Sequence, residues 1–223
     1  MSITLAHLRP ILSISLMVAV LFLFSACSDD EENTFHPSII TEMADLQTNE
    51  DSIVYAMVTD DGSSYAITNE LKGKEPLYTY RYICGYTLAE GKATLYTLQR
   101  VTCLADSTAH DTVYHDPLTL TSLWQKGHNI NMHLMAKTQG KPHQWGFIRD
   151  SVKSNLAGGS TYYLSLYHDQ DNDPESYGEH IYLTLRTDSV TDTPAPTDSI
   201  RFTIHTYTGK RTWDLVFHSP FFP

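Results

Sequence analysis

The sequence predicts an all-β protein: a small OB-like five-stranded barrel, then an antiparallel Ig-like β-sandwich, both preceded by a cleaved lipoprotein signal peptide. Three observations predict this organisation. Short runs of alternating apolar and polar residues recur between turn residues, as half-buried strands require. Tyrosine (14 residues) and threonine are plentiful, which favours strands over helices. An apolar N-terminal run ends in small residues and a cysteine, which is typical of an export signal.

The N-terminal run predicts where the chain is cut and anchored. Residues 11–24 are almost wholly apolar, but this run is shorter than the roughly 20 residues needed to span a bilayer. Ser25 and Ala26 are small enough for a signal peptidase. We therefore predict a signal peptide over residues 1–26, acylation of Cys27, and an acidic tether over residues 27–37. The alternative is an ordinary secretory signal in which Cys27 is incidental.

Acylation would fix the protein to a membrane. Each buried methylene group contributes about 0.8 kcal/mol, so the two or three acyl chains of a bacterial lipoprotein hold it firmly in the bilayer. The acidic run Ser28–Glu32 resembles the surface-export tag of lipoproteins in one Gram-negative phylum, although it also suits a plain solvated tether. The predicted location is the outer membrane, lipid-anchored and facing the cell exterior.

The charge of the chain excludes one class of partner. The formal net charge is −11, from 15 basic and 26 acidic residues. Removing residues 1–26 removes Arg9 and no acid, which leaves about −12. Proteins bind phosphate backbones by displacing counterions with Lys and Arg, so a nucleic-acid partner is not expected.

The first half of the mature chain predicts the barrel, over residues 38–108. Asp60-Asp61-Gly62 predicts a tight hairpin turn, because glycine supplies a positive φ. Cys84 and Cys103 are expected on neighbouring strands about 20 Å apart, too far for a disulfide, and therefore as buried free thiols. The five candidate strands that suit an OB-like barrel are 39–46, 53–59, 63–68, 78–88 and 93–104.

The second half alternates more regularly and predicts the sandwich, over residues 114–218. In one strand Ile130, Met132 and Leu134 would face inward, while Asn131 and His133 face outward. A polar stretch, Asp106–Asp116, would separate the two domains. Similar strands are expected around residues 118–124, 143–149, 162–166, 181–185, 200–204 and 213–217, about seven in all.

Five segments of the mature chain resemble the NigD-like lipoproteins. They are residues 59–62 (TDDG), 93–99 (ATLYTLQ), 145–151 (WGFIRDS), 163–168 (YLSLYH) and 198–213, which begins DSI and ends TYTGKRTW. The resemblance implies an OB-like N-terminal domain followed by a C-terminal β-sandwich. The shared motifs are structural, and the resemblance implies no known activity, so it supplies no functional residues. The segment Ser189–Asp198 is longer than this resemblance predicts.

The chemistry of the sequence does not favour an enzyme. It contains no nucleophile elbow, phosphate loop, dinucleotide fingerprint or His-Glu-x-x-His motif, and no cofactor is expected. Alternating acids at Asp169, Asp171 and Asp173 are a weak candidate for a Ca²⁺ site. Pro174 argues against it, because it stands where an EF-hand loop has glycine. The alternative is a solvated hairpin loop. The 11 histidines lack short paired spacings and are interpreted as scattered surface residues.

Tyrosines are the best candidates for binding a ligand. On the sandwich, Tyr163, Tyr167, Tyr182 and Tyr207 could be exposed and contact sugars or peptides, or could simply pack across strands. On the barrel, four tyrosines share one face of a strand. That face also carries Cys84 and Leu88, so it is expected to be the core face, although a stripe that stacks a ligand's rings is the alternative: Tyr78, Tyr80, Tyr82 and Tyr86.

A triplet of Asp, then Ser or Thr, then a small or aliphatic residue occurs six times. It resembles the O-glycosylation acceptor of exported proteins in the same Gram-negative phylum, and the alternative is ordinary turn chemistry. The acceptors would be Ser52, Ser107, Thr112, Ser151, Ser189 and Ser199.

The sequence therefore favours a non-catalytic binding or accessory module at the outer membrane. Its partners would be the lipid bilayer, through Cys27, and an envelope protein, a glycan or a peptide. A structural or assembly component of a surface complex is the first alternative, and a hydrolase with an unrecognised site is the second. An edge strand that pairs with a partner, a tyrosine-lined groove, or a deep cleft with converging His and Asp would distinguish the three.

Overall fold

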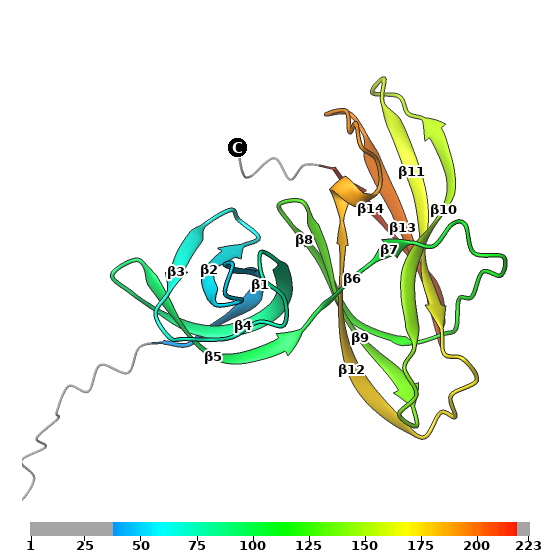
Figure 1. Ribbon diagram of the computed structural model, residues 1–223. Helices are drawn as coiled ribbons and strands as arrows, with labels where there is room; N and C mark the ends of the chain where they lie inside the picture. Colours follow the sequence, from blue (N-terminus) through cyan, green and yellow to red (C-terminus); the bar gives the residue numbers. More distant parts are fainter. Residues whose placement is uncertain (1–37, 218–223) are drawn as a thin grey trace, which may run out of the picture. The chain divides into compact units, whose positions relative to one another are not determined.

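The computed structural model describes residues 38–217. The predicted signal peptide, Cys27, the tether and residue 218 lie outside the described residues. Within residues 38–217 the chain forms 14 strands, arranged as one closed barrel and two sheets (Figure 1). The only helical segment of this part is a 3-10 turn, η2 (Thr187–Ser189). The predicted all-β fold, a barrel followed by a sandwich, is confirmed.

Five strands close the barrel in the order β1-β2-β3-β5-β4. Gly62, with φ +83°, lets the chain reverse between β2 and β3, as the Asp-Asp-Gly turn predicts. Residues of four strands fill a compact core: Ala44, Leu46, Val54, Met57, Cys84, Tyr86, Ala93 and Leu95. The strand bounds are β1 (Ile40–Thr48), β2 (Val54–Thr59), β3 (Ser64–Ile67), β4 (Thr79–Ala89) and β5 (Lys92–Arg100).

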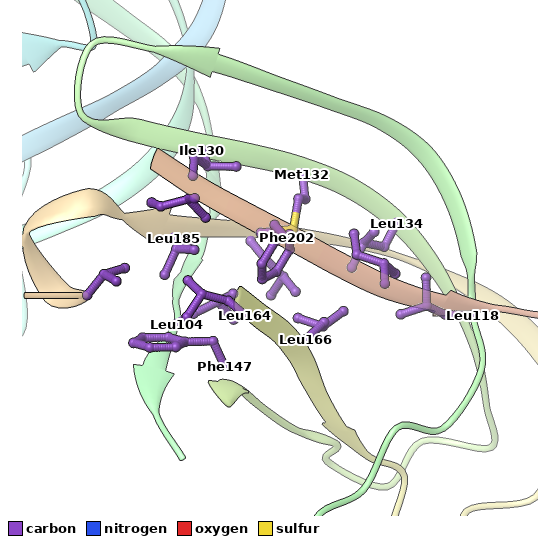
Figure 2. Close-up of a cluster of buried hydrophobic side chains, with 14 of the residues drawn as sticks. Leu104, Leu118, Ile130, Met132, Leu134, Phe147, Leu164, Leu166, Leu185 and Phe202 are labelled. Atoms are coloured by element: carbon purple, nitrogen blue, oxygen red, sulfur yellow. The ribbon is translucent and has the colours of Figure 1, made fainter. Parts of the chain in front are cut away.

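Two sheets form the sandwich, in the orders β14-β13-β11-β10-β7 and β6-β12-β9-β8. Figure 2 shows the apolar side chains of both sheets meeting between them. The bounds are β6 (Thr102–Cys103), β7 (Ala105–Asp106), β8 (Thr119–Lys126), β9 (Asn129–Thr138), β10 (Gln144–Ser154), β11 (Ser160–Asp169), β12 (Tyr177–Arg186), β13 (Ser199–Thr206) and β14 (Gly209–Val216).

The strands β6 and β7 lie within the range predicted for the barrel, but they pair with the sandwich. Thr102 and Cys103 pair with β12 in one sheet, and Ala105 and Asp106 pair with β10 in the other. The segment after Arg100 therefore adds an edge to both sheets in turn. The polar stretch Asp106–Asp116 follows this junction rather than preceding the first sandwich strand.

Three sequence expectations differ from the structure. Cys84 and Cys103 are free thiols, as expected, but Cys103 is exposed, because β5 ends at Arg100 and the chain leaves the barrel. The separation expected for the two cysteines assumes a regular hairpin in which Cys84 faces Thr97, but a bulge shifts the register by one residue, so Cys84 lies opposite Leu98. Asn131 is fully buried rather than facing solvent.

Candidate binding site

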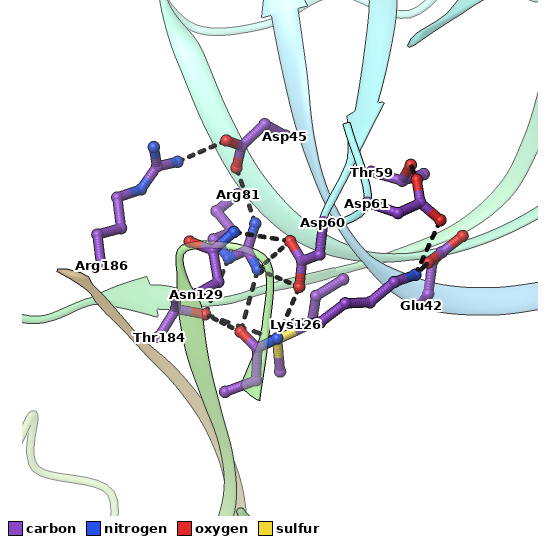
Figure 3. Close-up of polar contacts among 12 residues, drawn as sticks. Glu42, Asp45, Thr59, Asp60, Asp61, Arg81, Lys126, Asn129, Thr184 and Arg186 are labelled. Carbon is purple, nitrogen blue, oxygen red and sulfur yellow. Dashed lines mark hydrogen bonds and ion pairs between the residues drawn. The ribbon is translucent and has the colours of Figure 1, made fainter. Parts of the chain in front are cut away.

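A buried arginine joins the barrel to the sandwich. Arg81 on β4 points out of the barrel, and only 2% of its side chain is exposed. Its Nη1 donates to Asp45 of the barrel at 3.1 Å, and its Nη2 lies 2.7 and 2.9 Å from the two carboxylate oxygens of Asp60 (Figure 3). Its Nε also donates to Thr184 of β12 at 2.8 Å. One guanidinium therefore connects side chains of both domains.

Asp60 also accepts hydrogen bonds from two asparagines of β9. Asn131 Nδ2 donates to Asp60 Oδ2 at 2.6 Å, and Asn129 Nδ2 donates to Asp60 Oδ1 at 2.9 Å. Asn131 Oδ1 in turn accepts from Arg81 and from the Thr184 hydroxyl. This explains why Asn131 is buried: its side chain satisfies polar groups of the barrel. A buried charge that is paired and fully hydrogen-bonded fixes one relative geometry, because any shift would leave it unpaired.

Lys126, the last residue of β8, adds a second ionic contact. Its Nζ lies 2.8 Å from Glu42 and 3.2 Å from Asp61 (Figure 3). The Thr59 hydroxyl donates to Asp61 at 2.5 Å, and this hydrogen bond is the main reason that the pKa of Asp61 lies well below its usual range. Together these contacts link the side chains of the barrel to those of β8, β9 and β12.

The outer edge of β5 is open. β5 pairs with β4 along its length, but on its other side β3 reaches only Lys92 and Ala93. The Asn69 amide then pairs with the backbone of Leu95, at 3.0 Å for both hydrogen bonds. All five residues from Tyr96 to Arg100 are exposed, Tyr96 by 59%.

The direction of the unpaired backbone groups follows from the strand geometry. The Val101 amide donates to Arg81 on β4, so Val101 and Gln99 direct their amide and carbonyl groups toward β4. Successive residues of a strand alternate in this direction, so the groups of Leu98 and Arg100 point away from the barrel. Among residues 38–217 no strand pairs with them. Such an edge is a template for another strand.

A tyrosine groove lies at the end of this edge. The cavity has a volume of about 210 Å³, and its lining includes Tyr78, which directly precedes β4, Tyr80 and Tyr82 of β4, and Arg100 of β5. The ring centroids of Tyr78 and Tyr80 are 4.6 Å apart, and those of Tyr80 and Tyr82 are 6.3 Å apart. Arg100 forms no ion pair with any described residue. The groove therefore offers aromatic rings and a free guanidinium.

The prediction for this tyrosine face is only partly right. Tyr86 is buried in the barrel core, and Tyr82 packs against it, as a core face requires. Tyr78 is 48% exposed, because it lies where β5 has already left the sheet. The core-face prediction is therefore wrong for Tyr78, which precedes β4 and is accessible to solvent. Polar residues at the end of β5 indicate this open edge in the sequence: Thr97, Gln99 and Arg100.

The structure does not gather the four predicted sandwich tyrosines. Tyr163 and Tyr182 lie in different sheets: Lys153 and Arg201 contact the Tyr163 ring, and Tyr182 stacks on His133. Tyr167 is buried, so it is not available to a ligand as predicted. Tyr207 is 40% exposed and is one of the residues that line a cavity of about 200 Å³. The other three predicted tyrosines do not line this cavity. A single tyrosine platform on the sandwich is therefore not formed.

The six predicted glycosylation acceptors differ in accessibility. Thr112 and Ser189 are exposed, although the Ser189 hydroxyl donates to the Arg186 carbonyl at 2.7 Å. Ser107 is buried, which contradicts its use as an acceptor in the folded protein. The remaining three are half-buried: Ser52, Ser151 and Ser199.

The acidic loop does not form a cation site. Within the described part of the chain, no three His, Cys, Asp or Glu side chains are arranged to hold a metal. Asp169 accepts the Asp171 amide at 2.8 Å, as in an Asx turn, and Asp171 is exposed. Asp173 instead turns inward, where its carboxylate accepts from the Thr138 hydroxyl and the Gln139 amide. The weak Ca²⁺ prediction is therefore contradicted in its geometry.

A barrel and a sandwich joined by a buried ionic network, with an open strand edge on β5, define a two-domain all-β protein. A family model described as "NigD-like C-terminal beta sandwich domain" matches residues 101–217. The chain belongs to this NigD-like family, which is not a known family of enzymes. The match begins at the residue where β5 has ended, in agreement with the strand pairing.

Solved structures show the same fold. A "NigD-like immunity protein" from Bacteroides caccae has a TM-score of 0.63 at 24% identity, over 82% of this chain and 99% of that chain. A "Putative TOXIN related protein" from Parabacteroides distasonis gives 0.66 at 17% identity, over 82% and 95%. A "Putative lipoprotein" from Bacteroides fragilis gives 0.57 at 10% identity, over 82% and 100%. At these identities the likeness concerns the fold.

No curated protein matches the sequence. Within residues 38–217 there is also no helix with the length and apolar character that a bilayer crossing requires.

Proposed function

We propose that this protein is a lipid-anchored binding module at the bacterial cell surface, and that it takes up an extended segment of a partner protein along β5. The observation that carries the proposal is the open edge of β5, where five consecutive residues are exposed. Strand addition supplies affinity through backbone hydrogen bonds and specificity through pockets for alternate side chains.

The groove defines what the partner segment carries. Arg100 belongs both to the open edge and to the tyrosine groove, so a segment running along β5 arrives at the groove. A carboxylate on the segment would pair with the free guanidinium, and an aromatic or apolar side chain would contact Tyr78 and Tyr80. The rings are tilted by 55° and 42°, which gives no flat platform for a sugar chain. These features favour a polypeptide partner.

Anchoring rests on the sequence and on one relative. The run that ends at Cys27 has the pattern of a lipoprotein signal, and one solved neighbour is described as a lipoprotein. Lipidation at Cys27 would place the binding edge outside the cell, at the end of the acidic tether. Incorporation of labelled palmitate into the wild-type chain, and its loss in Cys27→Ser, tests this part.

The alternatives fit the structure less well. A hydrolase needs an accessible acid or base, but the His143 and Asp173 side chains, which lie 3.4 Å apart, are only 5% and 1% exposed. An assembly role would require the same edge of β5 to pair with a second copy of the chain. That outcome is distinguishable, because it makes the protein a dimer before any peptide is added.

The test is a peptide array probed with protein that begins at Ser28. Wild-type protein is expected to bind extended peptides in which an acidic residue alternates with aromatic or apolar residues. Leu98→Pro removes one outward-facing amide without removing a hydrogen bond to β4, because proline is tolerated where the amide of an edge strand faces solvent. We expect it to abolish binding, while the control Leu98→Thr keeps the amide and most of the binding.

A second variant covers the case in which Leu98→Pro disturbs the barrel. The Arg100 side chain is exposed and has no ion pair among the described residues. The variant Arg100→Ala should therefore fold normally and shift selection away from acidic peptides. If wild-type protein binds no peptide, or if both Leu98→Pro and Arg100→Ala bind as wild type does, the proposal is wrong.

A further inference from the structure

We infer that the sandwich carries a second site: a pocket beside Trp145 that binds one neutral pyranose ring, such as the terminal sugar of a glycan. The cavity has a volume of about 250 Å³ and is lined by Trp145 and His143 of the β10 region, Thr138 of β9 and Glu179 of β12, with Lys141 and Thr102 at its rim. It is smaller than the 300–1,000 Å³ of drug-sized sites, so it suits a single ring.

The wall of the pocket is held in place by stacking. Trp145 and His168 are direct partners across β10 and β11, and their rings lie parallel, with centroids 4.0 Å apart and planes within 5°. His168 is buried and cannot move, because its Nδ1 lies 2.8 Å from the Asp116 carbonyl. Burial lowers the pKa of His168 to about 4, so the ring is neutral and its Nε2 is an acceptor.

A chain of polar contacts continues from His168 to the floor of the pocket. His143 Nδ1 lies 2.9 Å from His168 Nε2, and His143 Nε2 lies 3.4 Å from Asp173 Oδ2. Both ring nitrogens of His143 therefore have a polar partner, one on β11 and one in the loop between β11 and β12. Asp173 also accepts from the Thr138 hydroxyl and the Gln139 amide, and these bonds help hold its pKa at about 2 despite the cost of burial.

This network is unusual for side chains that are almost fully buried. His168 and Asp173 are each only 2% exposed, where apolar residues would pack without a desolvation cost. The second carboxylate oxygen of Asp173, Oδ1, is buried and has no partner in the described structure. Local features that cost stability are expected where they serve a function. The function that this network serves best is to hold Trp145, Thr138 and His143 rigid around the pocket.

The charges at the rim identify the class of ligand. Lys141 supplies one positive charge and Glu179 one negative charge. These two charges offset each other, so the rim should favour neither an anion nor a cation. Glu179 is exposed and has no hydrogen bond to a described residue, and Lys141 keeps ammonium protons beyond its bond to the Asp171 carbonyl.

A pyranose ring matches this arrangement. Its axial C–H groups form an apolar face that contacts an indole, and its hydroxyl groups both donate and accept hydrogen bonds. Glu179 would accept from one hydroxyl and Lys141 would donate to another, as charge-assisted hydrogen bonds. With one aromatic contact and a few hydrogen bonds, the expected dissociation constant is about 0.1–10 mM.

The test is a titration of protein beginning at Ser28 with a panel of neutral methyl pyranosides, followed by amide chemical shifts. We expect at least one pyranoside to shift resonances of Thr138, His143 and Trp145. Trp145→Ala should weaken binding at least tenfold, whereas Trp124→Ala, on β8 and outside the pocket, should not. Glu179→Gln is exposed and keeps the shape of the side chain, so it tests the rim in a protein that folds normally.

Three outcomes would overturn the inference. The first is the absence of any shift in the pocket at about 50 mM of every pyranoside, well above the expected dissociation constant. The second is binding that both Trp145→Ala and Glu179→Gln retain. The third is a preference for acetate or for methylammonium over the neutral sugars. Leu98→Pro should leave sugar binding unchanged, so failure of this inference and failure of the proposed strand-addition function are distinguishable.

Discussion

Replacing Arg81 by methionine should weaken the protein more than any exposed charge change. The Arg81 side chain is 2% exposed and that of Asp60 is 3% exposed, so the change leaves a buried carboxylate with only the two asparagine amides as partners. Breaking a buried ion pair from one side costs about 3–5 kcal/mol. With an m-value of about 2–3 kcal/mol/M in urea, the unfolding midpoint should fall by about 1.5 M. The matched control is Arg201→Met, because Arg201 pairs with Asp214 at 2.6 Å but on the surface, where such a pair contributes less than about 1 kcal/mol.

The double variant Arg81→Met, Asp60→Asn separates the two parts of this cost. It removes the uncompensated charge, so it should be more stable than Arg81→Met alone by at least about 1 kcal/mol. Urea unfolding followed by tryptophan fluorescence and by circular dichroism measures both variants. If Arg81→Met loses no more stability than Arg201→Met, or if the double variant is less stable than the single one, the reasoning about the buried network is wrong.

Three further predictions follow from the packing and the titrating groups. Gly127→Ala should destabilise by more than Gly91→Ala, measured by urea unfolding: both glycines have positive φ, but a Cβ at Gly127 would lie 2.3 Å from the Asp60 carbonyl oxygen, whereas Gly91 has open space. Phe202→Ala should cost about 3–5 kcal/mol and lower the melting temperature of the sandwich, because Phe202 is fully buried in its core; full stability would contradict the packing described. Stability should fall as the pH falls from about 6.5 to about 4, because the unfolded chain protonates His168 in this window while the folded protein does not; His168→Gln should flatten this slope, and an unchanged slope would contradict the burial of a neutral ring.

Local patterns were enough to predict the strands. Alternation at Ile130, Met132 and Leu134 sets one face of β9 into the sandwich core, and the structure buries all three. The hairpin at Gly62 followed from local chemistry alone. These features depend on neighbours in the sequence, so one sequence suffices to predict them.

Features that depend on distant residues were not predictable. Asn131 has the spacing of a solvent-facing residue, yet it is buried because Arg81 and Asp60 arrive from the barrel, 50 and 71 residues away in the sequence. The bulge that exposes Tyr96 and the early end of β5 are likewise set by the path of the chain into the sandwich. The pairing of His143 with Asp173 required knowing that the acidic loop folds inward toward β9.

The passage from β5 through β6 and β7 also constrains how this architecture can be recombined. The short strands β6 and β7, Thr102–Cys103 and Ala105–Asp106, each form one edge strand of a sandwich sheet. A gene fusion that exchanged the N-terminal module at the polar stretch 106–116 would remove these edge strands. The backbone groups of β10 and β12 that pair with them would then be unpaired and open to other strands. An exchange at Val101 would carry the edge strands along intact, so natural or engineered shuffling of this sandwich with other modules should favour that breakpoint.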